Sequence, residues 1–196
     1  MLTIRGICKS FEGRSVLKNV SFDFPEAAVT ALRGPSGCGK TTLVNIILGL
    51  LAPDAGEVRM PLNARTAAVF QEDRLIEHFS AARNVRLTAP ASVTDRQIQA
   101  ALAELGFASE GEKRVSEFSG GMRRRVAVIR AALFQPQLLL LDEPFKGLDE
   151  EMRARTASFL RRNCAQATTI LVTHDETEAA LMGATAELDL GGKGES

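Results

Sequence analysis

The residues Gly-Pro-Ser-Gly-Cys-Gly-Lys-Thr at positions 34–41 have the types and spacing of a phosphate-binding loop, G-x-x-x-x-G-K-[ST]. Its glycines let the backbone curl so that N–H groups point at phosphate oxygens, and the N-terminus of a following helix adds partial positive charge. Lys40 would add a full charge for the terminal phosphates, and the Thr41 hydroxyl is an oxygen ligand of the kind that Mg²⁺ prefers. Cys38 is expected to contribute its backbone rather than redox chemistry. Chance matches to this pattern in a chain of this composition number about 0.005, so an ordinary glycine-rich turn explains it poorly.

A second chemical element is the acidic pair that follows four leucines at residues 138–141. Such a run is typical of a strand that is buried on both faces of a parallel sheet. Asp142 would then lie at the carboxyl edge of the sheet, where it can hold Mg²⁺ directly or through water. Glu143 must point elsewhere, and we expect it to accept a proton from the water that attacks a γ-phosphate. A simple capped strand end is the alternative.

Two more polar residues follow apolar runs. His174 comes after residues 170–172, and at the edge of the same sheet it could bind the γ-phosphate or orient the water; a lone histidine in such a place is more often a surface residue. Gln71 comes after residues 67–70 and in isolation needs no function.

Hydrophobic periodicity predicts an α/β chain in which strands and helices alternate after a strand-rich opening. Thr94 and Gln97 have the spacing of a capping box, and acidic residues after Asp149 suit the first turn of a helix. The expected strands are residues 2–8, 16–24, 29–32, 67–70, 138–141 and 169–173, and the expected helices are residues 43–50, 94–105 and 149–164.

Composition narrows the class of protein. At 196 residues the chain corresponds to one compact domain of the usual size of about 150. Lys plus Arg and Asp plus Glu both total 24, so a strongly basic nucleic-acid binder is not expected. The richest apolar stretch, residues 43–52, is far shorter than the roughly 20 residues of a membrane span. Three scattered cysteines suggest neither a disulfide framework nor metal spacing, which fits a cytoplasmic compartment.

These motifs occur in an order that resembles the nucleotide-binding subunit of ABC transporters over nearly the whole chain. The strings that carry the resemblance are GPSGCGKTT (34–42), Gln71, FSGGMRRR (118–125), LLLLDEP (138–144), GLD (147–149) and THD (173–175). The resemblance implies an α/β P-loop NTPase fold with a mostly parallel core sheet, an N-terminal antiparallel β subdomain and a short inserted α-helical subdomain. We expect one ATP-binding domain over residues 1–196, with a RecA-like core at about 1–75 and 134–190, a helical subdomain at about 76–133 and a frayed tail at 191–196.

The resemblance also implies ATP and Mg²⁺ as ligands, shared between two copies of the chain. In such a homodimer, Ser119, Gly120 and Gly121 reach the nucleotide of the partner. From the residues alone, SGG is a helix cap and the run Arg123, Arg124, Arg125 is a solvated face. By resemblance, catalytic roles fall to Glu143, His174, Gln71 and Lys40, and Mg²⁺ contacts to Thr41, Gln71 and Asp142. The ATP contacts fall to Phe11, Gly34, Pro35, Ser36, Gly37, Cys38, Gly39, Lys40, Thr41, Thr42, Ser119, Gly120, Gly121 and Asp149.

Some positions depart from the family pattern. Phe11 stands where Tyr is usual, which keeps stacking on adenine but loses the hydroxyl. Phe118 and Met122 replace the usual Leu and Gln of the signature, and we expect them to alter dimer packing without removing the phosphate contact.

The resulting hypothesis is an ATPase that powers a transporter, peripheral on the inner face of the cell membrane through separate integral-membrane permease subunits. The strings EDRL after Gln71 and PFKGLD at 144–149 are similar to strings in importers of nitrate, sulfonate or taurine type. This similarity favours import of a small solute, without choosing the solute, and an extracytoplasmic solute-binding protein as a further partner. The alternatives are a soluble ABC ATPase not coupled to transport and a nucleotide-gated module without turnover. Glu143 argues against the second alternative, because such a module needs no general base.

Overall fold

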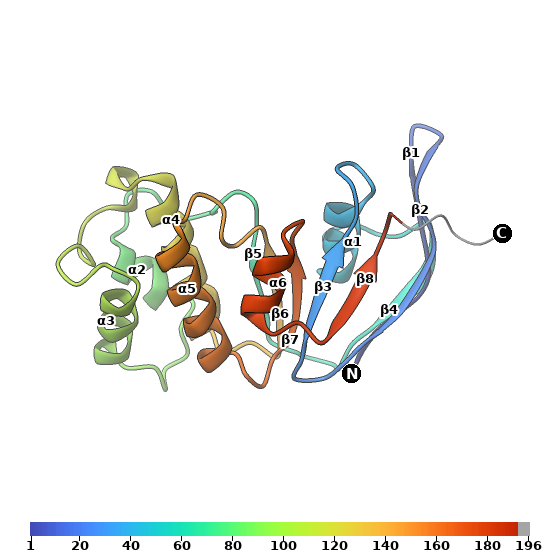
Figure 1. Cartoon of the computed structure of the whole chain (residues 1–196). Coiled ribbons are helices and arrows are strands. Elements are labelled where there is room, and N and C mark those ends of the chain that lie inside the picture. Colours follow the sequence, from blue (N-terminus) through green and yellow to red (C-terminus); the bar gives the residue numbers. More distant parts are fainter. Residues whose placement is uncertain (192–196) are drawn as a thin grey trace.

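Two β-sheets organise the computed structural model, which describes residues 1–191 (Figure 1). The first sheet is antiparallel, with the strand order β2-β1-β4. Its strands are β1 (Leu2–Phe11), β2 (Arg14–Phe24) and β4 (Ala55–Arg59). The apolar residues Leu2, Ile4 and Ile7 of β1 are buried on the face that turns to the rest of the molecule.

The second sheet is parallel, with the strand order β5-β6-β7-β3-β8. Its strands are β3 (Val29–Arg33), β5 (Thr66–Val69), β6 (Leu138–Asp142), β7 (Thr168–Val172) and β8 (Ala186–Asp189). The expected mixed fold, with a parallel core sheet and an N-terminal antiparallel sheet, is confirmed.

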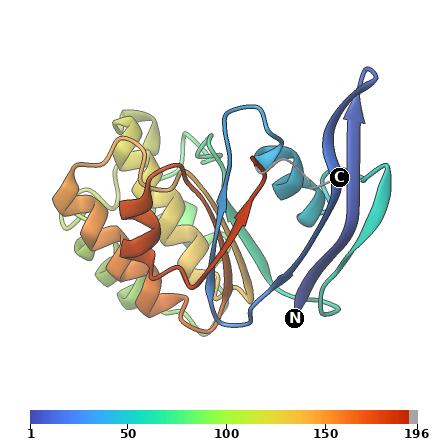
Figure 2. The same cartoon turned by 45° about the vertical axis from the view of Figure 1, so that its right-hand side comes forward.

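Both faces of the parallel sheet are covered, which explains the four consecutive leucines of β6. Leu138 and Leu140 pack on the side of helix α1 (Lys40–Ile47) and the antiparallel sheet. Leu139 and Leu141 pack on the opposite side, among the other helices. Helix α1 therefore lies between the two sheets, as both views show (Figures 1 and 2).

The remaining helices lie on the opposite side of the parallel sheet from α1, where the first two of them in the sequence form an outer layer against the helix that follows them (Figure 1). Between β5 and β6 the chain forms α2 (Ala81–Arg86), α3 (Asp95–Glu104), the short 3₁₀ helix η1 (Val115–Glu117) and α4 (Gly120–Leu133). After β6 come α5 (Glu150–Asn163) and α6 (Glu176–Met182). The helices before β6 fall in the region expected to form the helical subdomain; the subdomain boundaries stay a prediction.

Local signals at two helix starts are confirmed. The Thr94 hydroxyl accepts the Gln97 N–H at 3.3 Å and the Gln97 side chain accepts the Thr94 N–H at 2.8 Å, which completes the capping box of α3. The Asp149 carboxylate accepts the Met152 N–H at 2.8 Å at the start of α5. Apart from Gly191, the tail expected to fray lies outside the described residues. Of the helices within residues 1–191, none has the length and apolar character that crossing a membrane requires.

Candidate functional site

A cleft of about 360 Å³ lies where the phosphate-binding loop faces the carboxyl ends of β6 and β7. Val172 of β7 pairs in register with Leu32 of β3 on one side and Asp142 of β6 on the other, so the three strands end at the same level. Residues that are far apart in the sequence meet there. The cleft is lined by Phe11, Val16, Ser36, Gly37, Gly39, Lys40, Thr41, Thr42, Gln71, Asp142, Glu143 and Val172.

The loop that connects β3 to α1 depends on glycine at both ends. Gly34 has a φ of +135°, and a Cβ there would lie 2.6 Å from the Cys38 Sγ. Gly39 has a φ of +106°, and a Cβ there would lie 2.8 Å from a methyl carbon of Leu17. Because Gly39 also precedes α1 and has no side chain, the first N–H groups of the helix have no side-chain cap and can bind an anion.

Lys40, the first residue of α1, lies across this loop. Its ammonium donates to the carbonyl of Gly34 at 2.7 Å and to that of Pro35 at 3.0 Å. These contacts hold the positive charge at the mouth of the loop, on the wall of the cleft. Thr41 and Thr42 follow on the same turn and also line the cleft.

Oxygen donors for a hard cation meet at the end of β6. Asp142 is buried, and its pKa is raised above the ordinary value of aspartate. Burial is the larger cause and the negative charge of the adjacent Glu143 is the second, while the positive charges of Arg124 and Lys40 act in the opposite direction. A cation in contact with Asp142 would stabilise its ionised form. Thr41 and Gln71 offer further oxygens in the same cleft, so the residues fit Mg²⁺.

Glu143 adopts a backbone conformation that is uncommon for a residue with a side chain. Its φ is +48°, in the left-handed region that costs a residue with a Cβ on the order of 1–3 kcal/mol. Its N–H donates to the Val172 carbonyl at 3.1 Å, so β7 fixes this turn. The carboxylate lies 3.3 Å from the Lys146 Nζ and 3.9 Å from the His174 Nδ1.

His174 lies beside Glu143 rather than on the wall of the cleft. Its side chain is 81% exposed, and it is not among the lining residues. A contact with phosphate or water stays a prediction.

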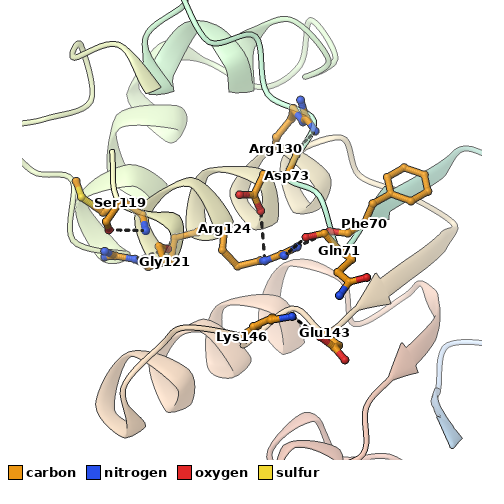
Figure 3. A network of polar contacts seen from close by, with 11 residues as sticks. Phe70, Gln71, Asp73, Ser119, Gly121, Arg124, Arg130, Glu143 and Lys146 are labelled. Atoms are coloured by element: carbon orange, nitrogen blue, oxygen red, sulfur yellow. Dashed lines mark hydrogen bonds and ion pairs between the residues drawn. The ribbon is translucent and has the colours of Figure 1, made fainter. Parts of the chain in front are cut away.

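The prediction that residues 123–125 form a solvated face is wrong for two of the three arginines. Arg124 is only 5% exposed; it donates to the carbonyls of Phe70 and Gln71 and forms an ion pair with Asp73 at 3.3 Å (Figure 3). Arg125 donates to the Leu105 carbonyl at 2.5 Å. Sequence reasoning missed both because their partners lie 20 or more residues away. A signal existed: Arg124 precedes buried residues of α4 by four and seven positions, which puts it on the apolar face.

The SGG and GLD segments lie next to one another but do not line the cleft. Ser119 caps α4 by accepting the Met122 N–H at 3.3 Å. A Cβ on Gly121 would lie 2.8 Å from the Gly147 carbonyl oxygen, so the two segments approach at backbone distance. Asp149 is exposed at the start of α5. Their expected contact with a nucleotide stays a prediction.

Phe11 and Phe118, which depart from the family pattern, lie in different surroundings. Phe11 ends β1, lines the cleft and is 46% exposed, with the Lys9 Nζ over its ring at 5.7 Å from the centroid. Phe118 is buried and packs on Phe107, with 5.3 Å between ring centroids. Phe118 thus belongs to the core of this chain and not to an exposed surface.

Comparisons with known proteins agree with this geometry. The family described as "ABC transporter" matches residues 17–146. The chain is 34% identical over 198 residues to the spermidine/putrescine import ATP-binding protein PotA of Mycoplasma capricolum, and this match covers 93% of the chain. It is 38% identical over 194 residues to the Fe(3+) ions import ATP-binding protein FbpC 1 of Rhodococcus jostii, and 38% identical over 200 residues to the sulfate/thiosulfate import ATP-binding protein CysA of Acinetobacter baylyi; each match covers 91% of this chain.

The chain spans 56% of the length of each of these three relatives. A solved structure described as the ATP binding subunit of an ABC transporter superposes with a TM-score of 0.88 at 24% identity. That match covers 97% of this chain and 86% of the other, and it shows the same fold.

Proposed function

Because the chain belongs to the ABC transporter family, we propose that it is the ATP-binding and ATP-hydrolysing subunit of an ABC importer. The observation that carries this proposal is the meeting of Lys40 with the acidic pair Asp142 and Glu143 in one cleft, although about 100 residues of sequence separate the lysine from the pair. The proposal makes ATP the substrate and ADP and inorganic phosphate the products.

Each residue of the cleft has a defined part in this reaction. Lys40 and the N–H groups of the loop and of α1 bind the phosphates. Glu143 accepts a proton from the water that attacks the γ-phosphorus, while the bond to the bridging oxygen of ADP breaks. His174, beside the Glu143 carboxylate, and Gln71, in the cleft, help to orient that water. Mg²⁺, held by Thr41, Gln71 and Asp142, neutralises charge on the phosphate oxygens when it is bound.

A second copy of the chain completes the site. Ser119, Gly120 and Gly121 stand at the start of α4, where helix N–H groups suit a phosphate, and they lie outside the cleft of their own chain. ATP between two copies would therefore hold them together, and its cleavage removes the γ-phosphate that both contact. Loss of such a shared contact is the differential interaction that a two-state switch requires.

The partners of the proposed subunit are integral-membrane permeases, with an extracytoplasmic solute-binding protein on the other side of the membrane. It would work on the inner face of the membrane, through contact with the permeases. The named solutes of the relatives are polyamines, ferric ions and sulfate or thiosulfate at 34% to 38% identity, so these names support import and do not select a solute.

Hydrolysis is tested by the release of inorganic phosphate from ATP by the purified chain, with and without Mg²⁺. The chain has no Trp and no Tyr, so absorbance at 260 nm reports bound nucleotide against almost no protein signal at 280 nm. We expect Mg²⁺-dependent turnover in the native chain and weakened nucleotide binding in Lys40→Ala. Binding without turnover would favour a nucleotide-gated module, and unaltered affinity of Lys40→Ala would contradict the role of the loop.

A further inference from the structure

Residues 70–74, which we name the Gln71 segment, lie against helix α4 through arginine side chains. Arg124 donates one guanidinium nitrogen to the Phe70 carbonyl and another to the Gln71 carbonyl, the second at 2.5 Å. Its remaining nitrogen pairs with the Asp73 carboxylate at 3.3 Å. One planar guanidinium thus contacts three residues of the segment.

Arg130, further along α4, contacts the same segment beyond Gln71. It donates to the Arg74 carbonyl at 2.8 Å and to the Asp73 carbonyl at 3.2 Å. Four backbone carbonyls of the segment therefore accept hydrogen bonds from two side chains of one helix. Figure 3 shows the contacts of Arg124. The segment follows the end of strand β5 and has no regular secondary structure. The arginine side chains therefore supply its carbonyls with the hydrogen bonds that a neighbouring strand would supply within a sheet.

We propose that Arg124 is a positioning residue for Gln71: it fixes the backbone of residues 70 and 71 to α4, so that the Gln71 side chain is presented to the cleft. The inference rests on the proposed function for the chemistry of Gln71. In Figure 3 the Gln71 side chain lies on the side of the segment that faces Glu143, away from the arginine. Helix α4 begins at Ser119–Gly121, the residues proposed to contact the nucleotide of a second copy. The Arg124 contact therefore connects the helix that carries those residues to Gln71 in the cleft of the same chain.

The burial of Arg124 gives this contact its strength. Hydrogen bonds from a charged donor inside a protein are stronger than those from a neutral donor. Removing the guanidinium would leave the Phe70 and Gln71 carbonyls without this donor and the Asp73 carboxylate without its ion pair. Lysine cannot reproduce the contacts of the planar guanidinium with three residues, since its ammonium is a single point charge.

A first experiment measures the contact without any catalysis. Hydrogen exchange is compared in the native chain, Arg124→Ala, Arg124→Lys and the control Arg123→Ala for a peptide covering residues 68–76, which includes the bonded N–H groups on both sides of the segment: those at the end of β5, and that of Ile76, which donates to the Asn84 Oδ1 at 2.8 Å. Arg123 is next to Arg124 on α4 and forms only an outward ion pair with Glu77 at 2.8 Å. We expect exchange at least about tenfold faster in Arg124→Ala, an intermediate rate in Arg124→Lys and an unchanged rate in Arg123→Ala. Native rates in Arg124→Lys, which keeps the charge and the folded core, would overturn the proposal.

A second experiment is a double-mutant cycle on hydrolysis with Gln71→Ala, Arg124→Lys and both together. If Arg124 acts through Gln71, then Arg124→Lys lowers kcat about tenfold with ATP affinity within about twofold, and the double variant is no slower than Gln71→Ala alone. Multiplying effects would show a separate structural role and overturn the proposal.

The two experiments separate this inference from the proposed function. Absence of phosphate release from the native chain would contradict the proposed function, while the exchange rates still show whether Arg124 holds the segment. Faster exchange together with a native kcat in Gln71→Ala would overturn the positioning role, because no reaction would then depend on the position of Gln71.

Discussion

Glu143 unites an uncommon backbone conformation with a carboxylate that lies between Lys146 and His174. Glutamine keeps the size of this side chain and one acceptor oxygen, but it has an NH₂ donor in place of the second oxygen and cannot accept the proton from water. We expect Glu143→Gln to bind ATP, to hydrolyse it at least about 10²-fold more slowly and to favour an ATP-bound dimer. Phosphate release and the nucleotide retained at 260 nm measure this. Glu150→Gln, which changes an exposed glutamate of α5, is the matched control. Full activity of Glu143→Gln would refute the role of general base.

Asp142 lowers the stability of the protein when no Mg²⁺ is bound, because its carboxylate is buried and lies next to the carboxylate of Glu143. Asp142→Asn removes the charge and keeps the shape. Without Mg²⁺ we expect the Tm to rise by about 2–4 °C, which corresponds to roughly 1 kcal/mol in a chain of this size. The gain should shrink as the pH falls below the raised pKa of Asp142 toward the ordinary aspartate value of about 3.9, where the native carboxyl is also neutral.

Asp142→Asn should raise the stability of the free chain but reduce the further stabilisation that Mg²⁺ and ATP provide. Thermal unfolding followed by circular dichroism, with and without both ligands, measures the two together. The native chain should gain stability on ligand binding and Asp142→Asn much less. An equal gain in both chains would show that Asp142 holds no metal.

At the scale of elements, the sequence was sufficient wherever the physical cause is local. The phosphate loop follows from its own glycines, β6 from a run of leucines covered on both faces, and α3 from a capping box within four residues. Strand β4 and helix α6 were not anticipated, since β4 is nearly all exposed and α6 has seven residues, too few for a periodic pattern. Arg124 was misread because its partners belong to a segment more than 50 residues away.

The loop of residues 34–39 offers a prediction about an element rather than a single group. Alanine at Gly34 meets the Cys38 sulfur at 2.6 Å and takes a φ of +135°. We expect Gly34→Ala to lose at least about tenfold in nucleotide affinity and about 1–3 kcal/mol in stability. The matched control is Gly13→Ala in the β1–β2 turn, where φ is +79° and no atom lies within 4 Å of the added Cβ. Titration with a fluorescent nucleotide and thermal unfolding measure the two effects. Equal losses in both variants would show that backbone strain alone is responsible.

At the scale of the whole molecule, the cleft and the SGG segment of one chain are separate surfaces. A site shared between two copies therefore predicts complementation. Lys40→Ala damages the cleft. Gly120→Asp damages the SGG segment and should leave the fold intact, because no atom lies within 4 Å of a Cβ at Gly120. In a mixed dimer of the two variants, one site combines both defects and the other has none.

Two inactive variants should thus regain activity when mixed, which phosphate release measures. Random pairing makes about half of the dimers mixed, and one of their two sites is intact, so activity should approach about one quarter of the native value. Mixing Lys40→Ala with Glu143→Gln is the matched control: both residues line the cleft, so each site of that mixed dimer keeps one defect and no activity returns. Recovery in the first mixture alone requires that each nucleotide contact the cleft of one chain and the SGG segment of the other. Equal behaviour of the two mixtures would contradict the shared site.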